Sequence, residues 1–202
     1  DNILFTFEEI DKVIDQDKNL PRIPYPFPTL NKMTYGIGGN EFILLTAQEG
    51  VGKTEVVRAL EYDILQQTDD NIGTIHLEET KLRQIKGLVG YRLRKPIHLP
   101  DEEIDKTLLK ETYKEVVKRD ERLHIYSHFG SSDPSLLLDS IRFLVSARGC
   151  KYVFLDHITQ VVTGLVDKDK TSALDYLSTS LESMVKDLNF TLFCISHVNE
   201  ND

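Results

Sequence analysis

The stretch ILLTAQEGVGKTEVVRAL, residues 43–60, joins an apolar run, a short loop with two glycines and the start of a helical pattern. The loop fits the relaxed phosphate-binding pattern, in which Ala47 is followed by four residues and then by Gly52, Lys53 and Thr54. Glycines let backbone N–H groups turn toward an anion, and the helix that begins near Lys53 adds its positive end. A chance match in a strand-to-helix turn is the alternative. Because an apolar run precedes the loop and a helical pattern follows it, the stretch predicts a nucleotide-binding site.

The residues of this loop have separate expected tasks. Gly50, Val51 and Gly52, together with Lys53 and Thr54, are expected to bind the nucleotide. The ammonium of Lys53 is expected to reach the β- and γ-phosphates, and the hydroxyl of Thr54 to ligate Mg²⁺. The expected cofactor is therefore Mg²⁺ with a nucleoside triphosphate.

Composition limits the classes of protein that the chain can represent. Its 202 residues are 40% hydrophobic, which predicts one core and one domain with at most a small appendage. The net charge of -9 provides no overall basic field for a nucleic acid or a membrane, so any polyanion must bind locally. Cys150 and Cys194 lack metal-ligand spacing and favour a reducing cytoplasm. The sequence has no transmembrane run or signal peptide, and without an initiator Met it suggests a piece of a longer polypeptide.

The pattern beyond residue 40 predicts the fold class. Short apolar runs, rich in β-branched and aromatic residues, predict buried strands at 41–46, 73–77, 123–127, 151–156 and 190–196. Helical patterns lie between them at 53–67, 80–94, 101–118, 133–148 and 171–188. This alternation predicts an α/β fold with a mostly parallel, twisted central sheet flanked by helices.

The first 28 residues are predicted to stand apart from the main domain at 29–202. Apolar residues at helical spacing predict a short amphipathic helix within residues 1–20, formed by Phe7, Ile10, Val13 and Ile14. The following PRIPYPFP, residues 21–28, cannot be helical inside and is expected to run extended as a tether. A rigid loop packed on the core by its aromatic residues is the alternative.

Three predicted strands end in polar residues. YVFLD ends in Asp156, the arrangement of a Walker B carboxylate that holds Mg²⁺ through water, although a capping Asp would look the same. GTIHL is followed by Glu78 and Glu79, where a carboxylate could polarise an attacking water; a solvated acid pair at a helix start is the alternative. FTLFCIS leads into His197, for which a structural role is the default. Because ligands of open α/β sheets bind outside the carboxyl ends of strands, three polar ends on one sheet favour a functional site.

The order of these motifs resembles a known family. The phosphate loop is followed by HLEE, by FLDH with ITQVV directly after it, and by CISHVN. This order is similar to the RecA-like motor domain of the hexameric replicative DNA helicases, the DnaB-like superfamily, and within it to the bacteriophage T7 primase-helicase and Twinkle type. The resemblance covers roughly residues 28–200, and its most specific pieces are LDHITQVV and ISHVN. It implies a RecA-like P-loop NTPase fold with an N-terminal linker helix.

The resemblance also implies roles for single residues. Lys53 and Thr54 match the Walker A lysine and hydroxyl, and Asp156 matches the Walker B aspartate that holds Mg²⁺. Glu78 matches the catalytic glutamate that activates water. His197 matches the strand-end residue that senses the γ-phosphate and relays its state to loops that bind DNA. The implied nucleotide is ATP or dTTP.

Partners follow from the same resemblance. The segment GLVDKDKTS, residues 164–172, corresponds to a loop that faces single-stranded DNA in the channel of a ring, with Lys168 and Lys170 as its cations; an ordinary surface loop is the alternative. Residues 1–28 correspond to a linker that docks on the neighbouring subunit, with Phe5, Phe7 and Ile10 as the docking face. The implied partners are single-stranded DNA, copies of the chain in a homo-oligomeric, hexameric ring, and a primase domain or protein. No membrane partner is implied.

The leading hypothesis is a ring-forming, NTP-dependent replicative DNA helicase in a bacterial or phage-infected cell, rather than in the mitochondrial matrix. The alternatives are a RecA-type recombinase ATPase and a nucleotide-gated assembly module without turnover. In the family, the arginine finger and much of the second DNA loop lie beyond the sensor strand, past Asp202 in this numbering. An arginine supplied in trans is worth about 10³ to 10⁵ in rate, so the isolated chain is expected to bind nucleotide but to hydrolyse it poorly.

Overall fold

The structure, a computed structural model, describes residues 6–16, 22–48, 50–100, 102–126, 133–162 and 167–197. Its centre is a five-stranded sheet in the order β1-β5-β4-β2-β3, and every strand pair in it is parallel. The strands are β1 (Phe42–Ala47), β2 (Asn71–His76), β3 (Leu123–Tyr126), β4 (Cys150–Asp156) and β5 (Thr191–His197). Each lies at its predicted place, with small differences at the ends. The predicted α/β class with a parallel sheet is confirmed.

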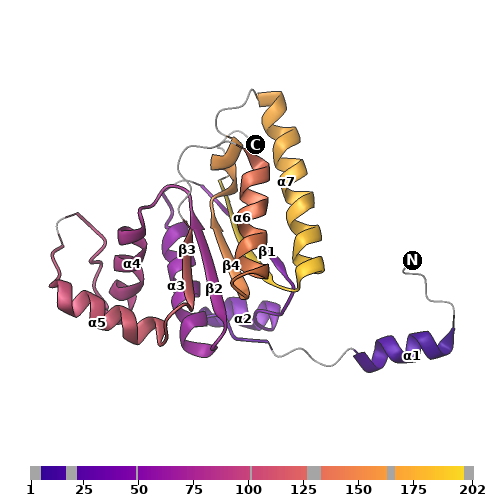
Figure 1. The fold of residues 1–202 in the computed structure, drawn as a ribbon, viewed down its shortest axis with the longest axis horizontal. Helices are drawn as coiled ribbons and strands as arrows, with labels where there is room; N and C mark the ends of the chain where they lie inside the picture. The colour runs from indigo at the N-terminus through magenta and orange to yellow at the C-terminus, as the bar shows by residue number, and fades with distance from the viewer. Residues whose placement is uncertain are drawn as a thin grey trace.

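Helices cover both faces of this sheet (Figure 1). They are α3 (Lys53–Gln67), α4 (Lys81–Leu93) and α5 (Lys106–Val117) on one side, and α6 (Pro134–Ser146) and α7 (Asp167–Leu188) on the other. The described part of the chain has three further, shorter helices: α1 (Phe7–Gln16), α2 (Pro28–Thr34) and the 3-10 helix η1 (Ile158–Val162). The sequence pattern did not predict α2 or η1.

Alternation along the central strands creates two hydrophobic cores. On β4, Val153 and Leu155 pack with α6 and α7, whereas Phe154 faces the opposite side with α3 and α4. The Phe154 ring stacks on that of Phe193 from β5, with 4.6 Å between the ring centroids. Because both faces of these strands are buried, their sequences are mostly apolar, as expected from the sequence.

The proline-rich segment packs on the body of the molecule from residue 22 onward. Ile23 forms an antiparallel bridge with Ile37, and Tyr25 is buried in the core beside α3. Arg22 donates to the carbonyl of Gly36 at 2.6 Å and pairs with Glu41 at 2.8 Å. Residues 22–27 are therefore non-helical, as predicted, and Ile23 and Tyr25 pack against the body as in the packed-loop alternative. The domain boundary at residue 28 stays a prediction.

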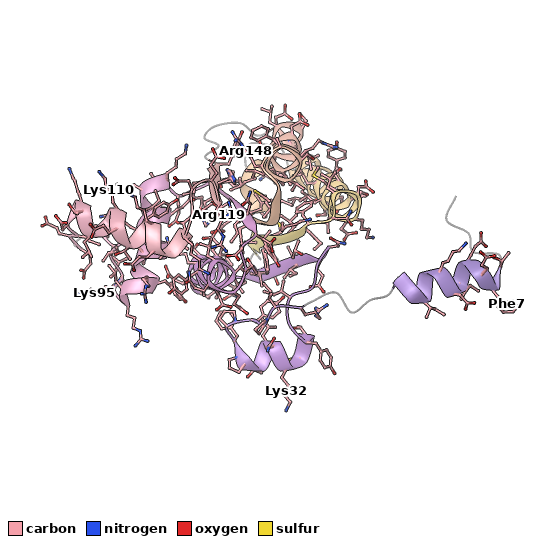
Figure 2. The ribbon with its side chains drawn as sticks, turned by 60° about the horizontal axis from the view of Figure 1, so that its bottom comes forward. Phe7, Lys32, Lys95, Lys110, Arg119 and Arg148 are labelled. Carbon is pink, nitrogen blue, oxygen red and sulfur yellow. The ribbon has the colours of Figure 1, made fainter. Side chains whose placement is uncertain are left out.

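Helix α1 confirms the predicted N-terminal helix and lies apart from the body (Figure 2). Its Phe7 side chain is 86% exposed, and Ile10 and Ile14 are exposed as well. Phe5, the third residue of the expected docking face, lies outside the described residues. The described part of α1 thus presents apolar side chains that no neighbouring element of the fold covers.

The segment at 164–172 differs from the expected loop. Helix α7 already begins at Asp167, so Lys168 and Lys170 belong to its first turns. Residues 163–166 lie outside the described part of the chain. Acidic Asp167 and Asp169 near the amino end suit the positive pole of a helix, which accounts for the earlier start. The prediction of a loop across residues 167–172 is wrong.

Cys150 and Cys194 are both free and buried. Burial raises the pKa of the Cys150 and Cys194 thiols to about 12. Within the described ranges, no helix has the length and apolar character needed to cross a bilayer.

Candidate nucleotide-binding site

The phosphate loop connects the carboxyl end of β1 to the amino end of α3. Gly50 and Gly52 have φ values of 78° and 91°, a region that side chains with a Cβ disfavour. Open space surrounds both positions, so the backbone conformation alone requires these glycines. Gly52 is also the residue before the first helical turn, where free N–H groups and the helix dipole attract anions. The two glycines thus have backbone conformations that suit a turn around an anion, and phosphate binding stays a prediction.

Lys53 extends back over this loop. Its ammonium donates to the carbonyl oxygens of Ala47, at 2.7 Å, and Gln48, at 2.6 Å. The positive charge is thereby held at the mouth of the loop, next to the helix amino end. An anion bound to the loop would meet the ammonium and the helix dipole together.

Thr54 and Asp156 come together although 102 positions separate them. The Thr54 hydroxyl donates to Asp156 Oδ2 at 3.1 Å. Asp156 ends β4, and only β5 separates this strand from β1. Parallel strands end at the same edge of a sheet, which explains why the two side chains meet. A hydroxyl and a carboxylate are hard oxygen ligands that suit Mg²⁺.

A metal ion at this place would also need ligands from outside the chain. Among the described residues, no group of three or more His, Cys, Asp and Glu side chains is arranged to hold a metal. Mg²⁺ usually takes one or two protein ligands and completes its shell with phosphate oxygens and water. Thr54 and Asp156 therefore fit a magnesium ion that arrives with a nucleotide.

The two glutamates after β2 have different surroundings. The Glu78 side chain is 58% exposed, and its Oε2 lies 3.9 Å from Nδ1 of His157. The Glu79 side chain is only 14% exposed and is bound by Arg58 at 2.5 Å and by Arg83 at 3.1 Å. The Glu79 carboxylate is already ion-paired with two arginines, whereas the Glu78 carboxylate is accessible to water. Glu78 stays the candidate for activating a water molecule.

His76, for which the sequence suggested no role beyond packing or the surface, lies buried beneath these carboxylates. Its Nε2 is 2.9 Å from Glu61 Oε1, and its Nδ1 is 3.8 Å from both Glu79 Oε2 and Asp156 Oδ2. Burial by itself lowers the pKa of His76, but Glu61 and then Asp156 and Glu79 outweigh it, so the pKa is raised above its ordinary value. The neighbouring carboxylates thus favour the charged form of this buried ring.

For the remaining predicted site residues, the structure gives mainly the position of the backbone. His197 ends β5 beside Ala47, so the third polar strand end reaches the same edge of the sheet. Lys168 and Lys170 lie at the start of α7, which Figure 1 shows at the top of the molecule. The side chains of His197 and Lys168 are outside the described part of the structure, and Lys170 is partly buried. The roles of these three residues stay predictions.

Sequence reasoning missed the buried charges around Glu79. Arg58 lies one helical turn after Thr54, and His76 lies on β2, inside runs that look like ordinary helix and strand. The available signal was a charged residue within an apolar stretch, which is rarely buried unless it is paired. Glu79, which pairs with Arg58, and Glu61, which pairs with His76, come from other parts of the fold, so the sequence did not show these pairs.

The fold and the loop together define a RecA-like α/β domain with a P-loop. A family model, described as the DnaB-like helicase C-terminal domain, matches residues 23–201. The chain therefore belongs to the DnaB-like helicase C-terminal domain family.

Relatives agree with this membership. A DNA helicase/primase of Enterobacteria phage T3 is 27% identical over 174 residues, which are 84% of this chain and 30% of the relative. The replicative DNA helicase DnaC of Bacillus subtilis is 27% identical over 78 residues, 39% of this chain and 17% of the relative. The chain thus spans less than a third of the length of these relatives.

Solved structures show the same fold. One of them, described as an ATPase domain, has a TM-score of 0.69 and 19% identity, covering 96% of this chain and 69% of that one. A KaiC-like protein from the archaeon Pyrococcus horikoshii has a TM-score of 0.63 and 17% identity, covering 89% of this chain and 71% of that one. At these identities the likeness concerns the fold, and it confirms the RecA-like class.

Proposed function

We propose that this chain is the NTP-hydrolysing motor domain of a ring-forming replicative DNA helicase, which moves along single-stranded DNA by hydrolysis at the interfaces between subunits. One observation carries the proposal: the fold gathers a lysine, a hydroxyl and two carboxylates at one edge of its sheet, namely Lys53, Thr54, Asp156 and Glu78. Membership of a helicase domain family supports the same reading.

The chain's own residues would bind and orient the triphosphate. The Lys53 ammonium would exchange two carbonyl partners for the β- and γ-phosphates, because an ammonium binds an anionic oxygen more strongly than a neutral carbonyl oxygen. Thr54 and Asp156 would hold Mg²⁺. When bound, this ion offsets the negative charge of the phosphates. ATP or dTTP is the proposed nucleotide.

Glu78 would orient a water molecule toward the γ-phosphate and accept its proton. A general base must lie within hydrogen-bonding reach of water, and the Glu78 carboxylate is exposed to solvent. Glu79 is unsuited to the task because two arginines already bind it. His197 would sense the γ-phosphate from the end of β5.

Partners belong to the same proposal. Lys168 and Lys170, at the start of α7, are the candidate contacts to single-stranded DNA, while the net charge of -9 would lie on the outside of the ring. The exposed apolar residues of α1 would dock on a neighbouring copy. The T3 relative is named a helicase/primase, so a primase domain or protein is a proposed partner. The proposed compartment is the cytoplasm of a bacterial or phage-infected cell.

Steady-state hydrolysis tests the proposal. The full-length protein would be assayed with ATP and dTTP, with and without single-stranded DNA, beside Lys53→Ala and Glu78→Gln. We expect DNA to stimulate the wild type, and Glu78→Gln to lower kcat by about 10² to 10⁴ while nucleotide still binds. Lys53→Ala should weaken binding as well, because it removes the phosphate's cationic partner.

Matched controls are Lys110→Ala and Glu103→Gln, both exposed and not part of the candidate site; Lys110 extends into solvent from α5 (Figure 2). Both should behave as wild type. A wild type that binds nucleotide but hydrolyses neither triphosphate, with or without DNA, would replace the motor proposal with a nucleotide-gated assembly module.

A further inference from the structure

Arg58 on α3 carries a charge in the interior of the molecule. Its side chain is only 3% exposed, and its guanidinium is held by two carboxylates. One terminal nitrogen donates to Glu55, and the other donates to Glu79 Oε1 at 2.5 Å. A buried arginine requires such partners, because an unpaired charge in the interior is strongly unfavourable. The Arg58 guanidinium is therefore fixed between α3 and the residues that follow β2.

Helix α4 has a glycine, Gly87, where it packs against the Arg58 side chain. A Cβ on Gly87 would lie 2.8 Å from Arg58 Cδ and closer still to its Nε, which is too close for any side chain. Gly87 is itself buried, so a side chain at this position could be accommodated only if Arg58 moved. Glycine at this place in α4 is explained by Arg58, since glycine otherwise weakens a helix interior.

The pair that Arg58 forms with Glu79 joins the two halves of the proposed site. Arg58 lies one turn after Thr54 on the same helix, and Glu79 directly follows Glu78. Since most of the Glu78 side chain is exposed, its position depends on the backbone that carries it. Arg83 also binds Glu79, but its side chain is 52% exposed, so solvent weakens that contact.

We propose that Arg58 is a positioning residue for hydrolysis: through Glu79 it fixes the peptide that carries Glu78 against the helix that carries Lys53 and Thr54. This inference rests on the function proposed above. Arg58 itself would touch neither nucleotide nor water. Because a displacement of about 1 Å in a reacting group can lower a rate about 10²-fold, loosening this link should reduce kcat more than nucleotide affinity.

The test uses the full-length protein and separates binding from turnover. Variants would be Arg58→Met, Gly87→Ala and the double variant Arg58→Met/Glu79→Gln, with Arg92→Met as control. Arg92 is an exposed arginine of α4 whose partner is Glu115, 3.6 Å away. For each, the dissociation constant of a nonhydrolysable ATP analogue with Mg²⁺, the kcat for ATP and the thermal midpoint would be measured.

We expect Arg58→Met and Gly87→Ala to lower kcat about 10- to 100-fold while the dissociation constant changes less than about threefold. The double variant leaves no unpaired buried charge, so it keeps the protein folded even where Arg58→Met does not. It should melt near the wild type and still have the low kcat. Arg92→Met should match the wild type in all three measurements.

Three results would overturn the inference. Recovery of wild-type kcat in the double variant would mean that Arg58 only neutralises Glu79. A loss of affinity as large as the loss of kcat would place Arg58 in binding. A kcat near the wild-type value in all variants would show that Arg58 has no role in hydrolysis. If the wild type itself fails to hydrolyse ATP, both the proposed function and this inference are wrong. This result can be told apart from the other three, in which the wild type hydrolyses ATP.

Discussion

The hydrogen bond between Thr54 and Asp156 offers the most specific test at the scale of single residues. Thr54→Val keeps the shape of the side chain but removes the hydroxyl that would ligate Mg²⁺. We expect Mg²⁺-dependent affinity for ATP to fall about 10- to 100-fold, because the ion loses one of its two protein ligands. Titration calorimetry with Mg²⁺ and with EDTA would measure this change.

Thr54→Ser is the matched control, since it retains the hydroxyl and should bind ATP and Mg²⁺ almost as the wild type does. Equal affinities for Thr54→Val and Thr54→Ser in the presence of Mg²⁺ would contradict the assignment of the hydroxyl.

Candidate site residues could be predicted from the sequence where a motif specified their positions. They could not be predicted where their surroundings depend on which side chains are buried together. The spacing of the loop made Lys53 and Thr54 candidates, and a polar end on an apolar run made Asp156 a candidate; the structure brings Thr54 and Asp156 together. The sequence could not separate Glu78 from Glu79 by surroundings, because the arginines that bind Glu79 come from two helices. That difference exists only after α3 and α4 have packed.

At the scale of elements, Arg122 joins the ends of helices and a strand. Its side chain is fully buried and donates to backbone carbonyls at Thr68, Asp70 and Val117, which follow α3, precede β2 and end α5. Arg122→Met would remove the donor from one buried and two part-buried carbonyl contacts, so we expect the free energy of unfolding to fall by about 3 kcal/mol. Urea denaturation followed by circular dichroism would measure it.

Arg142→Met provides the comparison for that variant, because Arg142 lies on the exposed side of α6. Its unfolding free energy should stay within about 0.5 kcal/mol of the wild type. If Arg122→Met is as stable as Arg142→Met, the buried carbonyl contacts contribute little and the role given to this junction is wrong.

Elements were predictable in proportion to their length and periodicity. The pattern of α3 and the apolar runs of the strands placed these elements almost correctly. Helix α2 was missed because it is short and starts at Pro28, the last proline of a stretch that was expected to run extended; proline is favoured at a first helical position. The start of α7 was misjudged because its charged first turn, DKDK, has no apolar periodicity.

At the scale of the whole molecule, the alternation of strands and helices predicted the class of fold, but not the order β1-β5-β4-β2-β3. That order places β5 between β1 and β4, and thereby sets the distance between the phosphate loop and Asp156. Strand order depends on crossovers between distant segments, which local patterns do not encode. The site is thus a product of topology as much as of its motifs.

The most direct measurement is a crystal structure of the protein with Mg²⁺ and a nonhydrolysable ATP analogue. We expect the phosphates in the loop between Ala47 and Thr54, with the Lys53 ammonium on the β- and γ-phosphates and Mg²⁺ on the Thr54 hydroxyl. We also expect that Glu78, and not Glu79, faces the γ-phosphate. Phosphates bound elsewhere, or Glu79 released from Arg58 and turned toward the γ-phosphate, would contradict the proposed site.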